Sequence, residues 1–101
     1  AQRNQALRSF SEGRHRVLVA TDVAARGIDV ANVAHVINFD MPKMAEDFVH
    51  RVGRTGRASA HGVASTFAVP AERGDLRKIE RTLSISMKRF RVRSADTALA
   101  A

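Results

Sequence analysis

The 101-residue chain is predicted to be an α/β domain with a mainly parallel sheet and flanking helices. Two short runs of β-forming residues, 16–20 (RVLVA) and 33–39 (VAHVINF), lack polar alternation, which predicts strands buried on both faces. A third run, 62–69 (GVASTFAV), predicts another strand, and a helical pattern separates it from the second. Because strands and helices alternate along the chain, we expect parallel strands joined through helices.

Three amphipathic segments predict the helices. The first has apolar residues at 6, 7 and 10 and is expected to end before Gly13. The second follows Pro42 and has apolar residues at 44, 45, 48, 49 and 52. The third has apolar residues at 76, 79 and 83, after Pro70 has ended the last strand.

The number of strands is low for an open α/β sheet with helices on both faces. The chain also begins inside a predicted helix, with no capping residue before it. We therefore expect a domain that is truncated on its N-terminal side, with residues 1–93 folded and residues 94–101 a disordered tail. Uncovered sheet faces and unpaired edges would then favour self-association of the chain.

Composition narrows the functional classes. The chain is 45% hydrophobic, which supports a packed core, and it has no cysteine, which excludes disulfides, thiol catalysis and cysteine-based zinc sites. No apolar run approaches the roughly 20 residues of a membrane span. We expect a soluble, cytoplasmic protein without a membrane partner.

The net charge of +7 is concentrated near the end of the chain. Residues 77–93 carry seven basic side chains against Glu80, a local net charge of +6. Such a segment suits the phosphate backbone of a nucleic acid. The alternative is a solvated helix face followed by a frayed end. Phe90 is the one aromatic residue in the segment, so base-specific recognition is not indicated.

A polar motif follows the first predicted strand. Residues 20–30 read ATDVAARGIDV, and ligands of open α/β sheets bind beyond the carboxyl ends of the strands. Thr21 offers a hydroxyl and an amide to a phosphate, and Asp29 offers a carboxylate to a sugar hydroxyl. On spacing alone, Thr21 and Asp22 could equally cap the start of a helix.

A second motif, HRVGRTGRA at 50–58, begins at the end of the second predicted helix. Arg51, Arg54 and Arg57 lie at intervals of three, where like charges on a helix repel, and each of the two intervening glycines weakens a helix by roughly 1 kcal/mol. The pattern suits bidentate binding of phosphate, and phosphoryl transfer needs such cations. The alternative is an exposed basic helix end favoured by the helix dipole.

Together these motifs resemble motifs V and VI of the DEAD-box ATP-dependent RNA helicases. The intervening VINFDMP and EDFVH segments are similar to those of family members, whereas the related DEAH group has QRxGRAGR in place of the second motif. The resemblance runs from Gln2 to Leu83 and is greatest to bacterial members. It implies the second of two RecA-like lobes, because the Walker A and DEAD segments of the first lobe do not occur here.

The resemblance also implies roles for individual residues. Arg54 and Arg57 match the catalytic arginines that reach the β- and γ-phosphates of ATP, and Arg57 corresponds to the arginine finger. Asp29 matches the residue that hydrogen-bonds the ribose of ATP. Thr21 matches a contact to an RNA phosphate.

Further matches concern RNA and the first lobe. Gln2 matches the start of a QxxR signature that contacts RNA, but Gln5 stands at the arginine position, which predicts a weaker grip on the RNA backbone. Arg26 and His50 match positions that couple the lobes. Arg51 is expected to form a structural pair.

The implied function is ATP-dependent RNA unwinding, with ATP and Mg²⁺ held mainly by the first lobe and with RNA bound independently of its sequence. The chain alone would be inactive. No protein-bound metal is expected, because no histidine has a second ligand at metal spacing. The alternatives are a basic RNA-binding module and a protein-interaction module, both without ATP chemistry.

Overall fold

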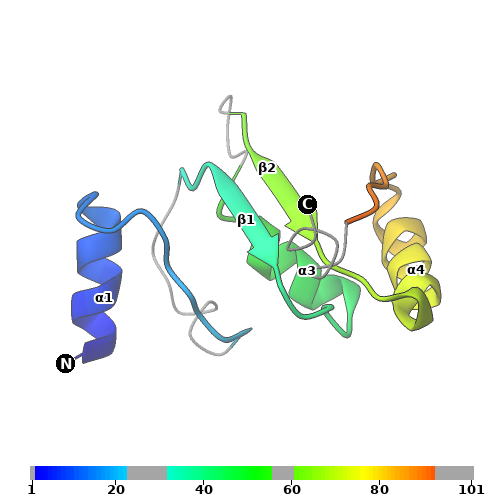
Figure 1. The fold of residues 1–101 in the computed structure, drawn as a ribbon, viewed down its shortest axis with the longest axis horizontal. Coiled ribbons are helices and arrows are strands. Elements are labelled where there is room, and N and C mark those ends of the chain that lie inside the picture. Colours follow the sequence, from blue (N-terminus) through cyan, green and yellow to red (C-terminus); the bar gives the residue numbers. More distant parts are fainter. Residues whose placement is uncertain (1, 23–31, 56–60, 93–101) are drawn as a thin grey trace, which may run out of the picture.

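The computed structural model describes residues 2–22, 32–55 and 61–92, in which helices and strands alternate (Figure 1). The elements are α1 (Gln2–Ser11), β1 (His35–Asn38), α3 (Ala45–Val52), β2 (Val63–Thr66), the 3-10 helix η1 (Pro70–Glu72) and α4 (Arg73–Leu83). This order confirms the predicted α/β class and all three predicted helices. The two strands are shorter than the runs 33–39 and 62–69 that predicted them.

The sheet consists of β1 and β2, which pair in parallel with His35 opposite Val63 and Asn38 opposite Thr66. The helix α3 connects these strands, as a parallel connection requires. Backbone hydrogen bonds extend the ladder at both ends, from Val63 N–H to the Ala34 carbonyl and from Phe67 N–H to the Asn38 carbonyl, each 3.0 Å.

The predicted strand at 16–20 is wrong. These residues have no regular secondary structure, and Figure 1 shows them crossing the space between α1 and β1. Val17 and Val19 are 77% and 92% exposed. A strand needs hydrogen bonds to a neighbouring strand, and none of the described strands pairs with this segment. A high β propensity without such a neighbour does not produce a strand.

The prediction that the strands are buried on both faces is also wrong. Residues in register share a face of a parallel sheet, so Asn38 and Thr66 lie on the face from which Arg51 of α3 contacts Asn38. The opposite face is exposed, with large apolar side chains from both strands and their extensions: Ile37, Phe39, Val63 and Phe67. On this face the rings of Phe39 and Phe67 meet edge to face, with centroids 6.1 Å apart.

The described core lies between helices. Phe48 of α3 is buried, as are Leu76 and Ile79 of α4, and the two helices pack against each other. The amphipathic spacing that predicted α4 therefore marks its buried side, whereas of the apolar positions that predicted α3 Phe48 is buried and Met44 and Val49 are exposed. Within the described part of the chain, no helix has the length and apolarity needed to cross a bilayer.

Candidate functional site

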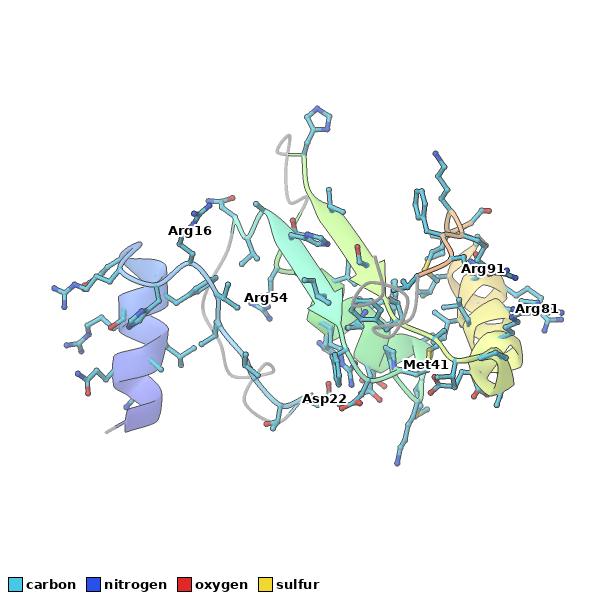
Figure 2. All side chains as sticks on the ribbon, in the orientation of Figure 1. Arg16, Asp22, Met41, Arg54, Arg81 and Arg91 are labelled. Carbon is cyan, nitrogen blue, oxygen red and sulfur yellow. The ribbon has the colours of Figure 1, made fainter. Side chains whose placement is uncertain are left out.

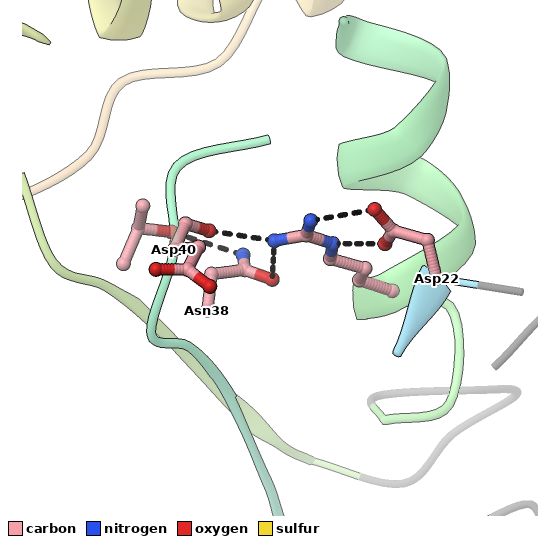
Figure 3. Close-up of polar contacts among 5 residues, drawn as sticks. Asp22, Asn38 and Asp40 are labelled. Carbon is pink, nitrogen blue, oxygen red and sulfur yellow. Dashed lines mark hydrogen bonds and ion pairs between the residues drawn. The ribbon is translucent and has the colours of Figure 1, made fainter. Parts of the chain in front are cut away.

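Arg51 connects the two sequence motifs. Its Nε donates a hydrogen bond to Asp22 Oδ1 at 2.5 Å, and its Nη2 donates one to Asp22 Oδ2 at 2.8 Å (Figure 3). This is the two-pronged geometry in which a planar guanidinium fits a carboxylate. Asp22 belongs to the motif at 20–30 and Arg51 to the motif at 50–58, so the pair joins one described residue of each motif.

The remaining nitrogen of the Arg51 guanidinium faces the end of β1. Nη1 donates to the carbonyl of Asp40 at 2.7 Å and more weakly to Asn38 Oδ1 at 3.4 Å, on the side opposite Asp22 in Figure 3. Asn38 is 2% exposed, and its Nδ2 donates to Thr66 Oγ1 at 3.1 Å. The chain of contacts therefore joins Asp22, α3, β1 and β2.

The electrostatics of this cluster favour a permanent charge on Arg51. The hydrogen bond to Asp22 raises the pKa of the Arg51 guanidinium, partial burial opposes the rise, and the charges of Asp22, Asp47 and Asp40 add to it. The Arg51 side chain is 19% exposed and that of Asp22 is 40% exposed, so the pair is partly shielded from water. The structural pairing predicted for Arg51 is confirmed.

Arg54 follows directly after the C-cap of α3. At that cap, Gly53, an added Cβ would lie 2.9 Å from the backbone carbonyl oxygen of Val49, which explains the glycine. The carbonyl of Arg54 accepts a hydrogen bond from Val33 N–H at 2.9 Å, just before β1 begins. The backbone of Arg54 is thus held beside the sheet, where Figure 2 labels the residue, and its side chain is half-buried.

The other predicted site residues make fewer described contacts than Arg51. His50 lies on α3 with its Nε2 3.6 Å from Glu46 Oε1, and both side chains are largely exposed. Thr21 is exposed and precedes Asp22. Gln2 begins α1, but its side chain lies outside the description.

Three predicted residues, Arg26, Asp29 and Arg57, fall in the ranges 23–31 and 56–60, outside the described residues, as does the predicted tail at 94–101. Within the described ranges, no three His, Asp or Glu side chains form a group that could bind a metal ion.

Sequence reasoning missed Asn38, Asp40 and Thr66 as members of the site. Asn38 did carry a signal, because it is the polar residue that ends the apolar run of β1 and its amide needs partners when buried. Asp40 contributes its main-chain carbonyl, and a backbone contact leaves no mark in the side-chain pattern.

The parallel α/β fold and the two sequence motifs are those of a RecA-like helicase lobe. Residues 1–59 match the family described as "Helicase conserved C-terminal domain", and the chain belongs to it. It is 54% identical over 99 residues to the "DEAD-box ATP-dependent RNA helicase CshA" of Geobacillus kaustophilus and of Bacillus subtilis. These matches cover 98% of the chain but only 21% and 20% of the relatives, so the chain spans about a fifth of their length.

Solved structures agree with this assignment. The E. coli DEAD-box protein SrmB, bound to the regulator of ribonuclease activity A (RraA), is 43% identical with a TM-score of 0.73, covering 95% of this chain and 55% of that one. A DEAD-box protein from Methanococcus jannaschii is 41% identical with a TM-score of 0.80, covering 89% and 25%. The chain therefore corresponds to part of the C-terminal, RecA-like lobe of DEAD-box helicases, as its two motifs predicted.

Proposed function

We propose that this chain is the second lobe of an ATP-dependent RNA helicase that couples ATP binding and hydrolysis to local unwinding of RNA duplexes. The observation that carries the proposal is the Arg51–Asp22 pair, which fixes Asp22, next to Thr21, against α3, the helix that ends at Val52 shortly before Arg54. An RNA contact at Thr21 and a phosphate contact at Arg54 would then move together. Coupling between two ligands is a free energy shared by their sites, and a connection of this kind is one way to carry it.

The proposed phosphate contacts are Arg54 and Arg57. A guanidinium binds two phosphate oxygens at once, and charge builds on the phosphoryl group during its transfer. Arg57 is the proposed arginine finger, a contribution worth about 10³–10⁵ in rate in related reactions. Asp29 would accept a hydrogen bond from the ribose, which orients the nucleotide.

The remaining roles concern RNA and the other lobe. Thr21 would bind an RNA phosphate, and Gln2 would add a weaker contact because Gln5 replaces the arginine of the signature. Arg26 and His50 would contact the first lobe when the cleft closes. That lobe and the nucleotide would hold Mg²⁺, and we place the activity in the cytoplasm, where ATP and RNA are both abundant.

Cleft closure is the proposed coupling step. ATP and single-stranded RNA would bind both lobes and draw them together, which brings Arg54 and Arg57 onto the γ-phosphate. The same closure would bend the RNA backbone and break a short stretch of duplex. Hydrolysis and phosphate release would then reopen the cleft.

Substitution of the arginines tests the proposal in a helicase that contains both lobes. We expect Arg54→Lys and Arg57→Ala to abolish most RNA-stimulated ATPase activity while nucleotide still binds the first lobe. Lysine keeps the charge but lacks the planar fork, so it should not rescue activity. Arg14→Lys, at an exposed residue paired with Glu12, is the matched control and should retain activity. Near-normal turnover by Arg54→Lys would refute the phosphate-clamp role.

The isolated chain provides a complementary test. We expect no ATP hydrolysis by the 101 residues alone, because the Walker A and DEAD segments are not part of the chain. RNA binding should be weak and should fall with added salt, since ionic phosphate contacts release counterions. A colorimetric phosphate assay and a filter-binding titration would measure both quantities, and hydrolysis above background would contradict the split-site proposal.

Protein binding is a second candidate function. The SrmB structure is of a complex with RraA, so a structural relative of this chain binds a regulator. The exposed apolar sheet face of this chain is a surface of the kind that joins another protein or a second copy of the chain. Neither form of association explains the glycine-spaced arginines, which favour the helicase function.

A further inference from the structure

The segment after α4 folds back and is fastened to that helix. The Glu80 carboxylate accepts hydrogen bonds from Arg89 Nη2 at 2.6 Å, from Arg89 Nη1 at 3.2 Å and from the backbone N–H of Met87 at 2.6 Å. The backbone N–H of Ile85 also donates to the Glu80 carbonyl at 3.0 Å. Residues 84–92, here called the return segment, are therefore held against α4 by both the side-chain carboxylate and the backbone carbonyl of Glu80.

The surface of α4 and the return segment is strongly basic. Glu80 is the acidic residue of 77–92, and Arg89 pairs with its carboxylate at 2.6 Å. Five further basic side chains of this range are exposed, and none forms an ion pair with a described acidic residue: Arg77, Lys78, Arg81, Lys88 and Arg91. Figure 2 labels Arg81 and Arg91 at the same end of the molecule, over α4.

A shallow groove runs between the helix and the return segment. Its lining residues are Arg77, Glu80, Arg81, Ser84, Ile85 and Ser86. Ser84 has a left-handed backbone conformation with φ of 55°, which ends α4 and turns the chain back along it. Guanidinium groups and hydroxyls on the walls of one groove are the donors that most often contact phosphate and sugar oxygens.

The return segment also presents an aromatic ring. Phe90 is 77% exposed, and Lys88 Nζ lies 5.3 Å from the centre of its ring. The return segment, whose first residues line the groove, thus also carries an exposed ring with a cation against it. Proteins bind single-stranded nucleic acid with basic residues that contact phosphates and with aromatic rings on which bases stack. A duplex keeps its bases stacked, so the ring favours a single strand.

We propose that α4 and the return segment form a second RNA-binding surface, in which Arg77 and Arg81 hold phosphates of a single strand and Phe90 stacks on a base. Figure 2 separates this surface from the motif residues, since Arg54 lies on the far side of the sheet from Arg81. The inference rests on the proposed function for its choice of RNA as the polyanion. Such a surface would retain a strand while the cleft between the lobes opens.

The test measures binding of fluorescein-labelled oligouridine of about 12 nucleotides to the 101-residue chain by anisotropy at several salt concentrations. The double variant Arg77→Ser with Arg81→Ser should bind about tenfold more weakly or worse. The slope of log affinity against log salt should be shallower by about 1.4, or about 0.7 for each phosphate that the variant no longer neutralises. The control, Arg16→Ser with Lys43→Ser, removes the same charge at exposed residues elsewhere and should change binding less than about twofold.

The ring is tested separately. Phe90→Leu keeps an apolar side chain but removes the stacking face, so affinity should fall about fivefold or more with an unchanged salt slope. Oligouridine carrying 4-thiouridine should crosslink to peptides within 77–92. The inference is overturned if crosslinks form only elsewhere, or if the control pair loses as much affinity as the groove pair. It is also overturned if polyglutamate of equal charge displaces RNA as well as unlabelled oligouridine does, because the surface would then bind acidic protein.

The helicase with both lobes separates this inference from the proposed function. At saturating RNA, the groove variants should keep their ATPase rate while needing more RNA to reach it. If Arg54→Lys retains turnover and the groove variants still lose RNA affinity, the proposed phosphate-clamp mechanism is refuted and the second RNA-binding surface is supported. If Arg54→Lys is inactive and the groove variants bind like the control, the second surface alone is refuted.

Discussion

Arg51 illustrates how one side chain can connect several segments of a candidate site. Its guanidinium contacts Asp22 with two nitrogens and the end of β1 with the third. A lysine has a single ammonium and could not reach both sides at once, which explains why arginine occupies this position. Arg51 thus fixes the end of α3, and Arg54, which we propose for phosphate binding, follows shortly after that end.

Replacement of Arg51 by lysine is expected to destabilise the chain by about 1–3 kcal/mol, because a charge-assisted pair is broken in a partly shielded place. Urea unfolding would measure this change in the free energy of unfolding. Arg14→Lys, at an exposed pair with Glu12, is the control and should cost less than about 0.5 kcal/mol. A double-mutant cycle with Asp22→Asn should show coupling, and additive effects would mean that the pair contributes nothing.

Two glycines permit a matched prediction about the end of α3. At Gly53 an added Cβ would meet the Val49 carbonyl at 2.9 Å, whereas at Gly74 inside α4 it meets nothing within 4 Å. We expect Gly53→Ala to destabilise by about 1–3 kcal/mol through overpacking, and Gly74→Ala to stabilise by about 0.5–1 kcal/mol through its higher helix propensity. Thermal unfolding compares the two, and equal shifts of the same sign would contradict the close approach at Gly53.

At this scale the sequence indicates which side chains suit a phosphate more readily than it indicates their partners. Arginines at intervals of three, two of them preceded by glycine, predict phosphate binding, which stays a prediction, whereas the structural pairing expected of Arg51 alongside the family resemblance is confirmed. The partner of Arg51 could not be read from the spacing, because Asp22 lies 29 residues away and any of several carboxylates would have served. The buried Asn38 was detectable only as a polar residue at a strand end.

At the scale of elements, helices were predicted better than strands for a physical reason. Helical hydrogen bonds are local, so the apolar spacing of α3 and α4 and their flanking breakers were enough to predict both elements. Strands depend on a neighbour that the local sequence does not specify. The runs at 33–39 and 62–69 contain two strands that pair with each other. The run at 16–20 has the same β-forming composition, but none of the described strands pairs with it.

The contact between α4 and the return segment gives a pH-dependent prediction. Hydrogen bonds from Arg89 and from the Met87 N–H lower the pKa of the Glu80 carboxyl below its usual 4.5. A lowered folded pKa stabilises the protein fully above the unfolded pKa, and this stabilisation disappears as the pH falls through the folded value. Glu80→Gln should therefore unfold more easily than the parent at pH 7, and the difference should vanish below the lowered pKa.

Urea unfolding from pH 7 down to about 3 would measure that difference. Glu12→Gln is the control, since its exposed pair with Arg14 contributes little at any pH. A stability difference for Glu80→Gln that stays constant across this range would show that packing, and not the carboxylate charge, holds the return segment.

At the scale of the whole molecule, the described residues bury few large apolar side chains and leave many exposed. The described core has three large buried apolar side chains, Phe48, Leu76 and Ile79, while a two-stranded sheet leaves one apolar face open. Two paired strands are marginally stable in water without further cover. The alternation of elements predicted the fold class, but the covering of the sheet depends on packing partners that a local pattern cannot identify.

The open face predicts the solution behaviour of the isolated 101-residue chain. Ile37, Phe39, Val63 and Phe67 are exposed on one side of the sheet, a face that also holds the hydrogen-bonded pair His35 and Ser65. Burying these apolar side chains against a second copy would remove their area from water. We expect light scattering to show dimers or larger assemblies, and the midpoint of thermal unfolding to rise with protein concentration. Ile37→Lys with Val63→Lys should shift the chain toward monomer, while Arg16→Lys with Lys43→Arg should not. A monodisperse monomer whose midpoint is independent of concentration would refute self-association and leave the helicase assignment intact.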